Sequence, residues 1–397
     1  MIAAGLPRSY WIVWCSTLVN HLCTFLIFLL PLYLTDARHL SLSLVGAVVA
    51  CASGANSLGL LTGGFCADRW GRTRTIQVAN TVAATSVFAL VFVSQWQAVA
   101  ALVTQASYAN GAARPALFAL IGDLVEAGDR VRAYSLLSWA TNIGLAGAAA
   151  GAGLLTAKGY TPAFALEAVA TLMSGLLIFR GVKDSGPSEA APGRNAKAED
   201  VRLLHDTVFL VFTLCGFLLA LVLTQKTFAL PLAIRADHLP AHVYGNLLAG
   251  SLLYVAVLQP LLIKLVTRLD KNKALAVGAA LVGLGFGSLG LADSIPVYVL
   301  AMLLWSTGEV VGTCCASATL LELSPAQARG TYQGAAMFTF SAAGFAGPLV
   351  TGLLMHDSSS SMVWTACLAL SGMSGLLHFL SGPRRNAQAS LRSAVDS

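Results

Sequence analysis

The hydrophobic pattern of the chain is a series of long apolar segments separated by short polar stretches. Segments of roughly 20 to 27 residues can each cross a bilayer core of about 30 Å, because an α-helix rises about 1.5 Å per residue. No small-residue cleavage site follows the first segment, so we expect that segment to remain as a span. The pattern predicts twelve membrane-spanning helices, at approximately 10–34, 43–66, 73–94, 97–122, 132–156, 162–180, 206–232, 242–267, 273–292, 295–320, 329–355 and 361–381.

One longer polar stretch interrupts the pattern at residues 181–205. It is rich in Pro, Gly, Ala and mixed charges, a composition typical of a flexible or amphipathic linker. The predicted fold class is therefore an all-α polytopic membrane protein with two groups of six spans. We predict an N-terminal six-helix bundle, a cytoplasmic linker, a C-terminal six-helix bundle and a cytoplasmic tail at 1–180, 181–205, 206–382 and 383–397.

The composition excludes a soluble globular protein. Hydrophobic residues make up 56% of the chain and charged residues 11%, whereas charged residues are about 25% of an average soluble domain. The net charge of +6 does not indicate a nucleic-acid partner, because most of the 24 Lys and Arg residues fall in loops on one side of the predicted spans. The asymmetry marks the cytoplasmic side, and an even number of spans places both termini there. We expect a multi-pass protein of a bacterial cytoplasmic (inner) membrane.

Several kinds of chemistry have no support in the sequence. The eight cysteines lie in apolar segments or at their edges and form no metal-spaced set with histidines. A phosphate-binding loop of the G-x-x-x-x-G-K-(S/T) type is absent. We therefore expect no metal, no cofactor and no enzymatic activity.

The most informative loop is residues 63–74, GGFCADRWGRTR, which concentrates charge between the second and third spans. Charges at membrane depth are costly, so this stretch should face water on the cytoplasmic side. The loop resembles the signature between the second and third helices of major facilitator superfamily transporters, roughly G-x-x-x-D-R-x-G-R-(R/K). The resemblance is carried by Gly64, Asp68, Arg69, Gly71, Arg72 and Arg74.

This resemblance implies two pseudo-symmetric six-helix bundles that rock around a central cavity. It also implies that Asp68 and the loop arginines bridge cytoplasmic helix ends and close the inner gate, because contacts made in one state bias that state's population. Asp123, Arg130 and Arg132 are the nearest expected partners. Replacing Asp68 with Asn should then reduce transport while the protein stays folded.

The two halves of the sequence repeat each other at an offset of about 199 to 200 residues, as parallel repeats do in this fold. The signature loop recurs in weakened form, with Thr267, Arg268, Lys271 and Lys273 at the positions of Asp68, Arg69, Arg72 and Arg74. Further matches set Glu322 and Arg329 against Asp123 and Arg130, and Pro231-Leu232 against Pro31-Leu32. A duplication places the substrate site between the halves by analogy.

Spans five and eleven carry closely spaced glycines, Gly144, Gly147 and Gly151 in one and Gly347 with Pro348 in the other. The pattern is similar to a glycine and proline motif of the drug:proton antiporter branch of the family, although Ala148 replaces the proline in span five. Close packing of helix backbones in lipid is the alternative explanation.

Glu309 is the main candidate for chemistry, because it lies near the middle of span ten. An ionisable group at that depth is costly unless it faces a partner or water. A carboxyl group in a low-dielectric cavity can exchange a proton near neutral pH, as proton coupling requires. Asn110 stands at the duplicate position of Glu309. Glu309 is either a coupling or cation-binding residue or a structural acid paired with a neighbour.

Other polar residues at depth leave alternatives open. His21, beside Asn20 in span one, is either a proton relay or a neutral hydrogen-bonded histidine. Arg114 in span four either takes a role in proton transfer or extends toward the interface and pairs with Asp123. Lys226, beside Gln225 in span seven, either binds an anionic group or holds Glu309 in a salt bridge.

The resemblance predicts a monomeric transporter that takes a small molecule and protons across the bilayer. The leading hypothesis is proton-driven efflux of lipophilic or cationic compounds by a drug-antiporter mechanism. The second hypothesis is proton-coupled uptake of a metabolite or peptide, with Lys226 and Arg114 binding an anionic group. A sensor or scramblase built on the same scaffold is the third.

Overall fold

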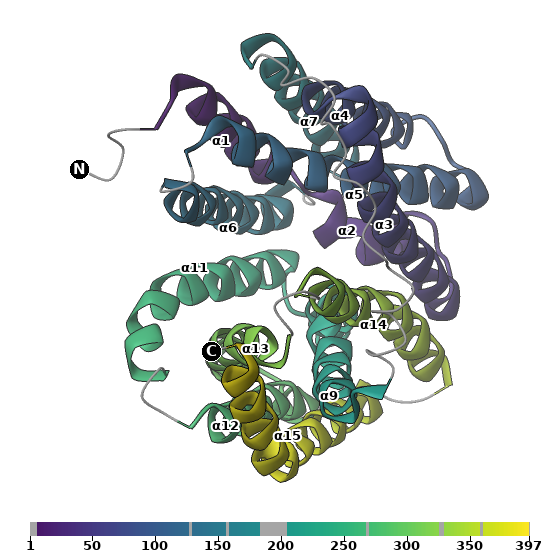
Figure 1. Cartoon of the computed structure of the whole chain (residues 1–397). Helices are drawn as coiled ribbons and strands as arrows, with labels where there is room; N and C mark the ends of the chain where they lie inside the picture. The colour runs from purple at the N-terminus through teal and green to yellow at the C-terminus, as the bar shows by residue number, and fades with distance from the viewer. Residues whose placement is uncertain are drawn as a thin grey trace. The chain divides into compact units, whose positions relative to one another are not determined.

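The structure is a computed structural model, and it describes residues 6–126, 129–155, 159–182, 205–266, 270–324, 329–357 and 360–396. These residues are predominantly helical, and no strand occurs among them (Figure 1). Eight helical segments in this part of the chain are long and apolar enough to cross a membrane. The predicted fold class, an all-α polytopic membrane protein, is confirmed.

The chain divides into two compact units, and each is described by itself. The first comprises Met1–Ala191 and Leu230–Leu253. Its helices are α1 (Arg8–Leu22), α2 (Leu26–Leu32), the π-helix η1 (Tyr33–Ala37), α3 (Leu42–Trp70), α4 (Arg72–Ala89), α5 (Trp96–Leu124), α6 (Arg130–Leu155), α7 (Thr161–Gly181), most of α10 (Ala229–Ala236) and the first half of α11 (Ala241–Val266).

The second unit comprises Pro192–Ala229 and Tyr254–Ser397. Its elements are α9 (Thr207–Leu223), the 3₁₀ helix η4 (Thr224–Lys226), the second half of α11, α12 (Lys271–Ser288), η5 (Leu289–Leu291), α13 (Ile295–Leu323), α14 (Arg329–Asp357) and α15 (Ser360–Asp396).

Each predicted span coincides with a helix or a broken helix in the described part of the chain. The residues predicted as a tail, 383–397, continue α15 as far as Asp396. The linker predicted at 181–205 lies outside the described residues except for its two ends. The division into bundles at 1–180 and 206–382 therefore stays a prediction.

The first span of each half is broken at equivalent places. In the first half α1 ends at Leu22 and α2 begins at Leu26; in the second half α9 ends at Leu223 and the chain passes through η4. A glycine packs against each break, because a Cβ on Gly147 would lie 2.5 Å from Leu22 Cδ2 and one on Gly347 would lie 2.3 Å from Thr224 Oγ1. The glycines of spans five and eleven thus make close helix contacts, as the packing interpretation requires.

The stretch expected as a loop at 63–74 is helical except at Gly71, which connects α3 to α4. Gly71 has φ 95° and ψ 153°, a backbone conformation that side chains other than hydrogen disfavour. Its amide donates to Ala67 O and its carbonyl accepts from Thr75 N, so the glycine ends one helix and begins the next. The predicted role of Gly71 in the motif therefore has a physical reason in the backbone.

The neighbouring glycines of α3 differ sharply in their surroundings, and a prediction follows from that difference. A Cβ on Gly63 would lie 2.2 Å from Ala112 O in α5, whereas a Cβ on Gly64 would meet nothing within 4 Å. Gly63→Ala is expected to destabilise the protein by about 1 to 3 kcal/mol through overpacking. Gly64→Ala is the matched control and should leave the unfolding temperature unchanged; equal effects of both variants would contradict the packing of α3 on α5.

Candidate functional site

The candidate site lies in the second unit and is built on η4, the 3₁₀ helix that follows α9. Lys226 is the last residue of η4, and its Nζ donates to Glu309 Oε2 at 2.7 Å and Oε1 at 2.9 Å. Glu309 comes from α13. The two side chains are half-buried, with 20% of Lys226 and 26% of Glu309 exposed. The sequence left a salt bridge as one alternative for Lys226, and the structure contains that pair.

Neighbouring side chains fix the position of η4. Gln225 is buried and its Nε2 donates to Leu221 O at 3.0 Å, while its Oε1 has no hydrogen-bond partner in the described part of the chain. Gly347 of α14 lies against Thr224, so the backbone of α14 closes on the break. Lys226 is therefore held on a short, rigid 3₁₀ turn and not on a flexible loop.

A second polar contact joins α13 to α11. Thr307, two residues before Glu309 in α13, forms a hydrogen bond with Tyr254 of α11 at 3.0 Å between the two hydroxyl oxygens. Residues two apart point to different faces of an α-helix, so this contact is separate from the ion pair. The site itself combines one ammonium and one carboxylate.

Two other predicted residues lie on α1 in the first unit. His21 Nδ1 lies 2.8 Å from Thr17 O within the same helix. Asn20 Oδ1 accepts from Thr171 Oγ1 at 2.9 Å, which ties α1 to α7. Asn20 is therefore engaged in helix packing, and His21 is hydrogen-bonded within its own helix.

Two expectations from the sequence differ from the structure. Arg114 is exposed and forms no ion pair with any described residue, so the alternative pairing with Asp123 is wrong in this state. Asn110 is exposed and has no hydrogen bond to a described residue, so it does not reproduce the pairing of Glu309. The reason is that Asp123 faces α4, where a closer cation is available.

The predicted gating residues form one ion pair in the first unit. Arg72, at the start of α4, pairs with Asp123 near the end of α5 at 2.9 Å between Nε and Oδ2. Asp68 and Arg130 do not join this pair: Asp68 is exposed without an ion pair among the described residues, and Arg130 Nε donates to Val125 O at 3.2 Å. The contact thus connects spans three and four.

An equivalent ion pair occurs in the second unit. Lys271, at the start of α12, pairs with Glu322 near the end of α13. These residues stand at the duplicate positions of Arg72 and Asp123, as the repeat in the sequence indicates. The duplication therefore preserves a contact between the third and fourth spans of each half, while Thr267 and Arg268 lie outside the described residues.

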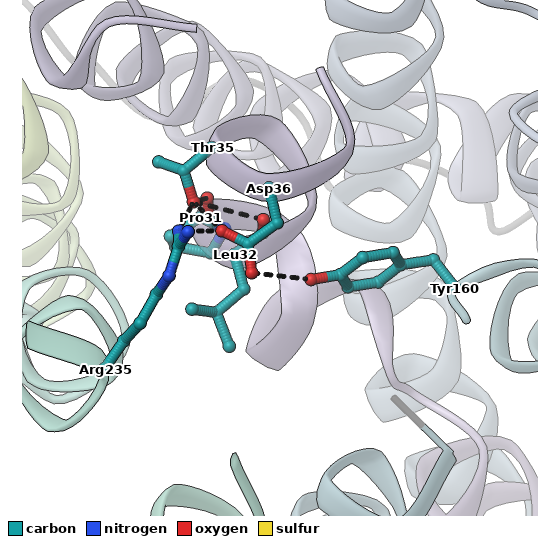
Figure 2. Close-up of polar contacts among 6 residues, drawn as sticks. All are labelled: Pro31, Leu32, Thr35, Asp36, Tyr160 and Arg235. Carbon is teal, nitrogen blue, oxygen red and sulfur yellow. Dashed lines mark hydrogen bonds and ion pairs between the residues drawn. The ribbon is translucent and has the colours of Figure 1, made fainter. Parts of the chain in front are cut away.

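A third polar cluster lies in the first unit (Figure 2). Asp36 of η1 forms an ion pair with Arg235 of α10, and Arg235 Nη1 also donates to Thr35 Oγ1 at 3.2 Å. Tyr160, just before α7, donates to Asp36 Oδ2 at 3.4 Å from the other side. Burial raises the pKa of the Tyr160 hydroxyl to about 12, so it stays a neutral donor at physiological pH.

Sequence reasoning missed this cluster as a site. Asp36 and Arg235 lie at helix ends, where charged residues are usual, and hydropathy gives no signal of their contact. A signal was available in the repeat, because Thr35 and Arg235 occupy equivalent positions in the two halves. Equivalent residues of a two-fold repeat can meet only near its axis.

Two further features bear on ligands. An apolar groove of about 720 Å³ runs along α3 and α5 and is lined by residues such as Leu44, Cys51, Trp96 and Tyr108. Among the described residues, no group of three or more His, Cys, Asp and Glu side chains is placed to hold a metal ion.

Comparisons with known proteins agree on one family. The family model described as Major Facilitator Superfamily matches residues 13–348 and, in a second match, 212–395. The uncharacterized MFS-type transporter YttB of Bacillus subtilis (strain 168) is 25% identical over 98% of this chain and 100% of its own length. The uncharacterized MFS-type transporter YqjV of the same organism is 24% identical over 83% of this chain and 82% of its own.

Solved structures with the same fold are transporters of the POT family. One, in complex with 5-aminolevulinic acid, has a TM-score of 0.81 at 11% identity and covers 96% of this chain and 98% of its own. Another, PepTSo, has a TM-score of 0.77 at 16% identity and covers 98% and 99%. Identities this low show a shared fold and do not carry a substrate from one protein to the other.

Proposed function

The chain belongs to the Major Facilitator Superfamily and is a multi-pass membrane transporter of a small molecule, and from this premise we propose that it couples transport to protons through Lys226 and Glu309. The observation that carries the proposal is their half-buried ion pair on the broken seventh span. Ionisable groups at membrane depth mark ion and substrate pathways in transporters. The proposed location is a bacterial cytoplasmic membrane, with the protein working as a monomer.

The ion pair implies a rule of coupling. While Glu309 is ionised, its carboxylate is the counter-ion of Lys226, and an anionic substrate must displace it. A proton on Glu309 removes this competition, so proton binding and anion binding favour each other. Two ligands that favour each other's binding cross the membrane together.

The geometry therefore favours symport of a proton with a small anionic or zwitterionic compound. A carboxylate of the substrate would bind the ammonium of Lys226 in place of Glu309. Under this proposal the vector is uptake, because the proton gradient of a bacterial membrane is directed inward.

Efflux of lipophilic or cationic compounds by proton antiport is the second candidate. The glycines of α6, the retained Pro348 of α14 and the apolar groove along α3 and α5 favour it. A cation would compete with the proton for Glu309, and this competition would give exchange in opposite directions. Drug export and multidrug resistance belong to this second candidate.

Alternating access also assigns roles to the other ion pairs. Asp36 and Arg235 tie α10 to the end of the first span, so their separation would accompany opening at that end. Arg72–Asp123 and Lys271–Glu322 lie at the opposite helix ends and would brace the cytoplasmic face of each unit.

Proton movement in proteoliposomes tests the proposal. Small carboxylates, dipeptides and ethidium are added, each in a separate experiment, to the outside of the proteoliposomes while the external pH is recorded. Symport predicts external alkalinisation on adding a carboxylate or dipeptide substrate, and Glu309→Gln should abolish accumulation driven by a pH gradient while exchange of labelled for unlabelled substrate continues.

Three outcomes contradict the proposal. Acidification on adding ethidium to the outside, absent in Glu309→Gln, favours the antiporter. Unchanged proton-driven accumulation in Glu309→Gln removes Glu309 from coupling. No flux with any compound favours a sensor or a scramblase.

A further inference from the structure

The break in the first span is held by a carboxyl group from another helix. Glu167, in the second turn of α7, accepts hydrogen bonds at Oε2 from Phe25 N at 2.9 Å and from Leu26 N at 2.7 Å. Only 4% of Glu167 is exposed. These two amides are among the donors that the interruption between α1 and α2 leaves without a regular helical partner. Phe25 N also donates to Cys23 O at 3.0 Å, so Glu167 is a second acceptor for Phe25 and the acceptor for Leu26.

Glu167 stands at the end of a polar seam between α1 and α7. Ser16 Oγ donates to Ser174 O at 2.9 Å, and Thr171 Oγ1 donates to Asn20 Oδ1 at 2.9 Å. The residues on α7 recur every three or four positions, so they share one helix face. The seam aligns Glu167 with the break and fixes where the chain changes direction.

The charge surroundings of Glu167 are unusual for a buried acid. Glu167 forms no ion pair with a described residue, and its Oε1 has no hydrogen bond to one. Residues 26–32, 75–89 and 135–155, which belong to α2, α4 and α6, contain no ionisable side chain. The titratable groups on the other elements packed against this part of α7 are His21 on α1, Cys23 directly after α1, and Tyr33 and Asp36 on η1.

Both protonation states of Glu167 are compatible with the observed geometry. A proton taken from water can add to Oε1 and leave both bonds to Oε2 in place. The neutral form avoids burying an unpaired charge, whereas the ionised form makes charge-assisted bonds that are roughly twice as strong as neutral ones. Ionisation of Glu167 therefore strengthens its hydrogen bonds to Phe25 N and Leu26 N, and proton uptake weakens them.

We propose that Glu167 is a proton-binding site of the transporter, separate from Glu309. The ionisation of Glu167 sets the strength of its hydrogen bonds to the break in the first span. The equivalent break in the second half carries Lys226, whose partner is also a carboxylate. A carboxyl group thus contacts the break in each half: Glu167 binds two backbone amides, and Glu309 binds the ammonium of Lys226. Glu167 acts as a positioning residue and does not need to touch the substrate.

Hydrogen exchange of the amides of Phe25 and Leu26 tests the proposal in the purified full-length protein. The rate of the segment 22–30 is compared between wild type and Glu167→Gln at the same pH, which cancels the intrinsic pH dependence of exchange. Gln keeps an oxygen acceptor for the amides but cannot ionise. Protection in wild type should equal that of the variant at low pH and exceed it about ten-fold at high pH.

Infrared spectra give a direct second measurement. The carbonyl stretch of a protonated carboxyl group should appear as the pH falls, and the part due to Glu167 should be missing in Glu167→Gln. Thr171→Val removes a bond from the same helix face without removing a titratable group, so it should keep the pH-dependent protection. His21→Gln should keep it too.

The outcomes separate this proposal from the proposed function. A protection ratio that is the same at every pH, or an infrared signal unchanged in Glu167→Gln, overturns the proton site at Glu167. Loss of the pH dependence in His21→Gln would assign the effect to His21 and would equally overturn it. Glu309→Gln should leave the ratio unchanged, so failure of coupling at Glu309 is seen separately.

Discussion

Replacing Lys226 with methionine is expected to destabilise the protein by about 1 to 3 kcal/mol, because it leaves the half-buried carboxylate of Glu309 without its counter-ion. Glu309→Gln leaves the ammonium of Lys226 unpaired and should have a cost of the same sign. The double variant Lys226→Met with Glu309→Gln removes both charges and should be more stable than the sum of the single effects allows. Thermal unfolding of the purified variants measures all three differences.

Lys273→Met is a matched control, because Lys273 is an exposed lysine of the same unit that has no ion pair among the described residues. Additive effects in the double variant would show that Lys226 and Glu309 do not interact in the membrane protein.

The elements of the fold were largely predictable because hydrophobic length is a direct physical constraint in lipid. The span predicted at 43–66 is α3, Leu42–Trp70, and the span predicted at 295–320 is α13, Ile295–Leu323. The helix ends extend beyond the apolar residues, because charged side chains such as Arg69 continue a helix outside the hydrocarbon core. Hydropathy therefore predicts the membrane-embedded part of each helix, whereas backbone hydrogen bonding determines where the helix ends.

The broken spans were not predictable from local sequence. Residues 23–25 are Cys, Thr and Phe, which an α-helix accepts without difficulty. The interruption depends on Glu167, which is more than a hundred positions away along the chain, and on Gly147 of α6. Contacts of this range have no signature in periodicity.

The sequence identified the residues of the site better than their partners. It placed Glu309 and Lys226 at membrane depth and named their salt bridge as one alternative, but helical periodicity did not fix which way either side chain points. The same limitation produced the wrong pairing of Arg114 with Asp123. Turning a helix about its axis by the angle of one residue changes which side chains contact its neighbours, but the hydropathy of the segment stays the same.

The repeat in the sequence leads to a second prediction with a control built into the chain. Asp123→Asn removes the partner of Arg72, whose side chain is only 10% exposed, and is expected to destabilise the protein by about 1 to 3 kcal/mol. Glu322→Gln makes the same chemical change at the equivalent position, but Lys271 and Glu322 are 40% and 45% exposed. Water and ions already screen that pair, so its loss should cost under about 1 kcal/mol.

The unfolding temperatures of both variants are measured at low and high salt. They show whether the loss of stability depends on the burial of the ion pair or only on the removal of a charge. The small effect of Glu322→Gln should decrease further as salt screens the exposed pair, whereas the effect of Asp123→Asn should persist because Arg72 is shielded from solvent. Transport should fall in Asp123→Asn more than in Glu322→Gln, since only the first removes an ion pair from a guanidinium that is shielded from solvent. Equal losses of stability in both variants would mean that the two duplicated pairs are solvated alike and that the burial of Arg72 has no energetic consequence.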